Sequence, residues 1–147
     1  VAMDLKREAL AADTWSWDAQ YDLIIEAVHY QTANAEVILD EAVRNVRAFA
    51  NDPDPFLPLV DYQRGKLAAV SGVALAKGQN ALKRYLQHEP QPDDPDLAWA
   101  EFRLAQVERQ MDLANAAESR LQRLESRTVP EDLSFALRDE RRWHYSD

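Results

Sequence analysis

The sequence contains no cysteine and only three glycines among its 147 residues. The absence of cysteine excludes disulfides, thiolate metal sites and thiol nucleophiles. No apolar run approaches the roughly 20 residues that a membrane-spanning helix needs, so we expect no membrane insertion. The glycines Gly65, Gly72 and Gly78 are not spaced as a phosphate-binding loop. Close helix packing and a turn explain them better.

Positive charge is scarce, because 17 basic residues face 26 acidic ones and the formal net charge is −9. Such a chain repels phosphate backbones, so we do not expect a nucleic-acid partner. Neutral or basic protein surfaces are better suited to it, and ordinary solubility accounts for the acidity at least as well. The bases are mostly arginine, which indicates a GC-rich, bacterial genome.

The length of 147 residues is that of one ordinary domain. The chain begins with Val1, and no signal-peptide pattern follows it. We expect a cytoplasmic protein, with the periplasm as the alternative if a leader once preceded Val1.

The seven prolines divide the chain into segments. They occur in three places only, at residues 53–58, at residues 90–95 and at Pro130. Proline breaks helix interiors, so each place marks a connection between helices. The intervals of roughly 35 to 40 residues between them are typical of helical repeats, in which each repeat is a helix–turn–helix unit.

Each interval also has a weak point near its middle, where one helix is expected to end and the next to begin. These points are residues 31–34, residues 77–80 and residues 111–113. In the second, Gly78 can take the left-handed conformation that ends a helix and Asn80 can cap the next one. In the third, Asp112 is the expected N-cap. The first is the weakest, since one continuous helix is the alternative there.

The segments between these points show the apolar spacing of amphipathic helices, for example Tyr21, Ile24, Ile25 and Val28. Strand-like alternation is absent, so the fold class is all-α. We expect a packed connection over residues 56–60, a loop over residues 89–96 with an aspartate capping the helix that follows, and a last helix from Pro130. Two tryptophans, Trp15 and Trp17, are expected to pack a helix over residues 4–12 onto the rest.

Corresponding helices carry similar residues at a regular spacing. Phe49, Tyr85 and Leu121 are separated by 36 residues each, and Leu67-Ala68 precedes Leu104-Ala105 by 37. A leucine followed by a small residue lets two helices approach closely. With the terminal prolines, these residues make the chain resemble the tetratricopeptide (TPR-like) repeat family. The units are about 17–53, 59–90 and 96–130, followed by a capping helix over about 130–143.

The resemblance implies stacked antiparallel helix pairs in a right-handed α-solenoid, with extra helices at both ends. It also implies a protein–protein interaction scaffold that holds a peptide, a helix or a partner subunit on the concave face of the first helices. Polar and aromatic residues of two first helices are the candidate partner-binding residues: Tyr62, Lys66, Trp99, Arg103, Gln106, Arg109 and Gln110.

Two other functions remain as alternatives. A short stack exposes its ends, so the chain could instead be a self-assembling module, for example a homodimer. The group of Arg138, Arg141 and Arg142 beside Trp143 has the composition of an interface. A small helical enzyme or metal carrier is the least favoured function. Glu26 and His29 have the spacing of half a di-iron motif but lack the other half, so we expect no catalytic residues, metal or cofactor.

Overall fold

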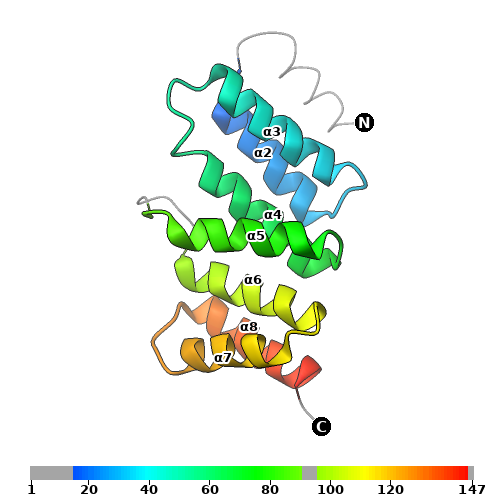
Figure 1. The fold of residues 1–147 in the computed structure, drawn as a ribbon, viewed down its shortest axis with the longest axis vertical. Coiled ribbons are helices and arrows are strands. Elements are labelled where there is room, and N and C mark those ends of the chain that lie inside the picture. Colours follow the sequence, from blue (N-terminus) through cyan, green and yellow to red (C-terminus); the bar gives the residue numbers. More distant parts are fainter. Residues whose placement is uncertain (1–14, 91–95, 146–147) are drawn as a thin grey trace.

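The computed structural model describes residues 15–90 and 96–145 and shows an all-helical protein (Figure 1). This confirms the expected fold class, and no strand occurs in the described part of the chain. The helix expected over residues 4–12 lies outside the described residues. The helices are α2 (Trp17–His29), α3 (Ala35–Phe49), α4 (Leu57–Ser71), α5 (Leu75–Gln87), α6 (Leu97–Gln110), α7 (Ala114–Glu125) and α8 (Glu131–His144).

The helices follow one another along the long axis of the molecule, from α2 and α3 at one end to α7 and α8 at the other (Figure 1). Within the described residues, α2, α4, α6 and α8 form a continuous series in which each contacts the next. The intervening helices α3, α5 and α7 each contact the helices before and after them in sequence but not one another. Helices α2, α4 and α6 begin at residues 17, 57 and 97, an interval of 40 residues (57 − 17 and 97 − 57).

Two of the three expected mid-interval breaks are confirmed. Helix α2 ends before Gln31 and α3 begins at Ala35, with Gln31 at a φ of 48°. Helix α6 ends before Asp112, which has a φ of 63°. Asp112 is therefore not the N-cap that we expected, because Leu113 occupies that position. An aspartate in the left-handed region suits such a turn, since its short polar side chain tolerates this conformation.

The turn expected at residues 77–80 was wrong, because Gly78 lies inside α5. The break occurs six residues earlier, at Gly72, which has a φ of 74° and donates its backbone N–H to the Ala68 carbonyl at 2.8 Å. Gly78 is a packing residue: a Cβ there would lie 2.3 Å from the Ala68 Cβ of α4. Glycine is needed here because it is small. Its backbone is not in the left-handed conformation.

Proline and aspartate positions explain where the other helices begin. Pro58 lies in the first turn of α4, where the missing N–H costs no helical hydrogen bond. The expected non-helical connection over residues 56–60 was therefore wrong beyond Phe56. Asp96 caps α6 as expected, and its carboxylate accepts a hydrogen bond from the Ala98 backbone N–H at 2.7 Å. Pro130 directly precedes α8, as the sequence predicted.

The core is divided into three apolar clusters along the stack, and each joins one helix pair to the first helix of the next. The first cluster lies among α2, α3 and α4, the second among α4, α5 and α6, and the third among α6, α7 and α8. Tyr85 and Leu121 are fully buried, whereas Phe49 is 61% exposed. Phe49 is thus not the core equivalent of the other two, and it stacks on Trp15 with ring centroids 6.4 Å apart.

Candidate functional site

The residues that the sequence singled out for partner binding lie on α4 and α6, which contact each other. We call Tyr62, Lys66, Trp99 and Arg103 the cationic cluster. Tyr62 is almost fully buried, and the other three are partly exposed. Lys66 and Arg103 are 37 positions apart in sequence and come together because α4 and α6 contact each other.

Arg103 is the centre of this cluster. Its guanidinium lies 5.1 Å from the centroid of the Trp99 ring and 5.7 Å from that of Phe102. One terminal nitrogen donates to the Gln106 side-chain oxygen at 3.0 Å, and the guanidinium also contacts the Tyr62 hydroxyl. The Nε atom is buried and has no hydrogen-bond partner among the residues that the structure describes. Arg103 therefore has a fixed position and an unsatisfied donor.

Lys66 lies close enough to Arg103 for the two charges to repel. Burial and the Arg103 charge together hold the pKa of the Lys66 ammonium below its usual range. Within the described residues, neither side chain forms an ion pair with a carboxylate. Two neighbouring cations without a counter-ion are a cost to the free protein that an anionic group from outside would remove.

The other three predicted residues form contacts between helices instead. Gln106 donates to one carboxylate oxygen of Glu140 at 3.1 Å, and Arg109 donates to the other at 2.9 Å. Glu140 belongs to α8 and its side chain is only 4% exposed. Gln110 donates to the Ala69 carbonyl of α4 at 2.8 Å. These contacts hold α4, α6 and α8 together and position the cationic cluster, while all three side chains remain partly exposed.

Helix α8 adds a residue that the prediction of this site omitted. A shallow depression of about 220 Å³ lies between α6 and α8, and Trp99, Arg103 and Trp143 are among its lining residues. The Trp143 side chain is 71% exposed, and a guanidinium from Arg142 lies 5.4 Å from its ring centroid. The sequence had marked Trp143 by its arginine neighbours. Only the contact between α6 and α8 places it beside Trp99 and Arg103.

One of those arginine neighbours has a structural role. Arg141 bridges two helices by donating to Glu118 at 2.7 Å and to Glu125 at 2.9 Å, both on α7. The hydrogen bonds to Glu125 and Glu118 raise the pKa of Arg141. Arg141 in turn holds the pKa of the Glu118 carboxyl below its usual value. Arg141 therefore links α8 to α7.

Metal-binding groups and membrane-spanning helices are both absent from the described residues. No group of three or more histidine or acidic side chains there is arranged to hold a metal ion, and none of the described helices is long and apolar enough to cross a membrane. His29 lies against the ring of Tyr30, with centroids 4.8 Å apart.

Comparison with known proteins gives no family model, no curated protein and no solved structure that matches this chain.

Proposed function

We propose that this protein is an interaction scaffold of the TPR-like kind, which holds an acidic peptide of a partner protein on the face formed by α4, α6 and α8. The observation that carries the proposal is the cationic cluster, in which Lys66 and Arg103 are neighbours and lack a carboxylate partner among the described residues. Arg103 lies against the partly exposed Trp99 and lines one depression with the exposed Trp143. A carboxylate between the two cations would satisfy both charges. Trp99 and Trp143 would contact the flanking part of the peptide.

The order of helices is compatible with this role. In the solenoid that the proposal requires, the first helices of successive pairs line one continuous face, and α2, α4, α6 and α8 do contact in series. The interhelix hydrogen bonds of Gln106, Arg109 and Gln110 keep that face rigid. A rigid face loses little conformational entropy when a peptide binds.

The test is affinity capture of the partner with three variants of the protein. In Lys66→Glu the new carboxylate lies beside Arg103 and takes the place of the partner's carboxylate. The double variant Lys66→Glu/Arg103→Glu reverses the charge of both cations. The matched control is Lys77→Glu/Lys83→Glu, which makes the same charge change as the double variant at two exposed lysines of α5. We expect both site variants to lose a partner that the wild type and the control retain.

Circular dichroism must show unchanged helix content in each variant. Equal capture by the wild type and the site variants would show that the partner binds elsewhere. Lys66→Glu is the more informative variant, because it replaces two repelling cations by an ion pair and so removes the partner site without a loss of stability.

Self-assembly through α8 is a second candidate function. Helix α8 is the last described helix, and two large aromatic side chains on it are exposed, Phe135 at 55% and Trp143 at 71%. Exposed aromatic groups beside arginines are common at interfaces. Sedimentation at several protein concentrations tests this function. A strict monomer at high concentration would exclude it, whereas a dimer that Phe135→Asp dissociates would establish it.

A further inference from the structure

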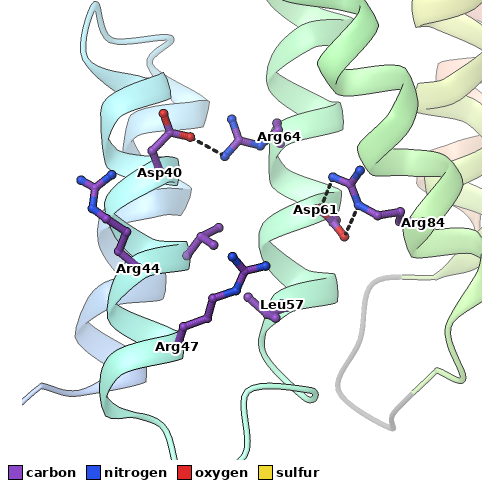
Figure 2. Close-up of a pocket in the computed structure, with 8 residues that line it drawn as sticks. Asp40, Arg44, Arg47, Leu57, Asp61, Arg64 and Arg84 are labelled. Atoms are coloured by element: carbon purple, nitrogen blue, oxygen red, sulfur yellow. Dashed lines mark hydrogen bonds and ion pairs between the residues drawn. The ribbon is translucent and has the colours of Figure 1, made fainter.

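A second polar concavity lies among α3, α4 and α5, outside the cationic cluster (Figure 2). It has a volume of about 490 Å³, and arginines from three different helices line it. We call it the arginine groove. Its arginines are Arg44 and Arg47 from α3, Arg64 from α4 and Arg84 from α5.

Two of these arginines are held in place by carboxylates. The Arg64 side chain is only 11% exposed, and its guanidinium pairs with Glu36 at 2.8 Å and with Asp40 at 2.9 Å. Arg84 pairs with Asp61 at 2.9 Å, and this hydrogen bond raises the pKa of Arg84. A guanidinium has five N–H donors, so both side chains keep donors beyond those that the carboxylates accept. These two arginines are pre-positioned parts of the groove.

The other two arginines have no such partner. Arg44 and Arg47 are exposed, and neither forms a hydrogen bond or ion pair with another described residue. They are one turn apart on α3, and Figure 2 shows Arg47 reaching from α3 toward Leu57 and Asp61 of α4. Their donors remain available for a ligand.

The charge of the groove is opposite to that of the whole chain. Four guanidinium groups and two carboxylates line it, a net charge of +2 (4 − 2), and +1 if Glu36 behind Arg64 is included. The whole chain has a net charge of −9. This local excess of positive charge attracts an anion, whereas the surrounding negative field repels a long polyanion such as nucleic acid. A short anionic ligand fits both conditions.

The lining also contains apolar side chains, Val43 of α3 and Leu57 of α4. A volume of about 490 Å³ is several times that of one inorganic anion and is in the range of sites that bind small organic ligands. The arginine fork matches the two oxygens of a carboxylate, and the apolar side chains offer contact to a neighbouring aliphatic group. These properties suit a short peptide in which acidic and aliphatic side chains alternate.

We propose that the arginine groove is a second peptide-binding site, which holds an acidic segment of a partner protein by its carboxylates. Arg44 and Arg47 form new charge-assisted hydrogen bonds with the segment, while Arg64 and Arg84 define the far side of the site. The site is independent of the cationic cluster and does not require the function proposed for that cluster.

The test uses a fluorescein-labelled hexapeptide of alternating glutamate and leucine, measured by fluorescence anisotropy at low salt. We expect binding that Arg44→Glu/Arg47→Glu weakens at least about tenfold, the loss of one to two charge-assisted hydrogen bonds. Both substituted side chains are exposed and unpaired among the described residues, so the variant is expected to fold. Lys77→Glu/Lys83→Glu makes the same charge change on α5 and is expected to bind like the wild type.

Four results would overturn the proposal. They are the absence of binding at millimolar protein, an equal loss in the α5 control, equal affinity for the glutamine–leucine version of the peptide, and displacement by inorganic phosphate at the peptide's own concentration. The last would identify a site for small anions only. Lys66→Glu separates the two proposals, because it must leave the affinity of the arginine groove for the hexapeptide unchanged.

Discussion

Replacing Gly78 by alanine tests the close approach of α5 to α4 at this position. Two effects oppose each other. Alanine favours the interior of α5 over glycine by about 1 kcal/mol. The new Cβ would lie 2.3 Å from the Ala68 Cβ, whereas carbon atoms in ordinary contact are about 3.5–4.0 Å apart. Both Cβ atoms are fixed to helical backbone, so neither can rotate away and α4 and α5 must separate.

Overpacking of a core costs about 1–3 kcal/mol, and we expect the upper part of that range because no flexible side chain can absorb the collision. Subtracting the gain in helix propensity leaves a net destabilisation of about 1–2 kcal/mol. For a chain of this length, that corresponds to a fall of roughly 2–8 °C in Tm. Urea unfolding followed by circular dichroism measures the free energy, and the double variant Ala68→Gly/Gly78→Ala provides the compensating change.

In the double variant the Cβ is transferred from α4 to α5, so the collision disappears. We expect its loss of stability to be at least about 1 kcal/mol smaller than the sum of the two single losses, the signature of residues in direct contact. Asn80→Ala is the control for helix propensity, since Asn80 is exposed on the same helix. Gly78→Ala as stable as the wild type, or strictly additive effects, would refute the close packing of α4 against α5.

Three further predictions concern charged groups. Glu108 is buried and pairs with Arg120 at 2.6 Å, so Arg120→Ala should cost about 2 kcal/mol in urea unfolding, and Glu108→Gln added to it should restore part of that loss. The hydrogen bond from Arg141 lowers the pKa of Glu118 from its ordinary value of 4.5. Their pairing therefore adds stability above pH 4.5, and this stability is lost as the pH falls through the lower pKa of the folded state. On acidification, the Tm of Arg141→Met should fall less than that of the wild type. Burial lowers the pKa of Lys66 in the folded state. Folding therefore carries a free-energy cost while the lysine is protonated, and this cost disappears once the pH exceeds the pKa of the unfolded chain. Lys66→Met should be more stable than the wild type at pH 7, and differential scanning calorimetry should show this advantage shrinking as the pH rises toward 10.

The sequence was a good guide to helices and a poorer one to their ends. Apolar residues repeat every three or four positions in helices such as α3, where Ile38, Leu39, Ala42 and Val46 are buried, because one face of the helix must be buried. An aspartate cap after the loop over residues 89–96 was expected from local chemistry alone, and the structure shows that Asp96 is the cap. The turn assigned to Gly78 was wrong because glycine serves both tight turns and close packing. The distance between two helices, which the local sequence does not contain, decides between these uses.

The candidate site shows the same contrast between what the local sequence predicts and what only the packing of helices decides. The expected repeat placed Lys66 and Arg103 on successive first helices, and the helices that carry them, α4 and α6, do contact each other. The involvement of Glu140 was not predicted, because Gln106 and Arg109 reach a helix that begins more than 20 residues later. The arginine groove was missed completely, because its residues come from three helices and no single segment contains its pattern.

The sequence by itself determined that this chain is all-helical, because helical periodicity and proline positions are local properties. It also determined that cysteine chemistry is absent and that the net charge is negative. Only the tertiary structure decided which polar side chains are free. Gln106, Arg109 and Arg141 contact other helices, whereas Lys66, Arg44 and Arg47 have no carboxylate partner among the described residues. The physical reason is that a charge is satisfied or left over according to its neighbours in space, and in a stack of helices those neighbours come from other helices.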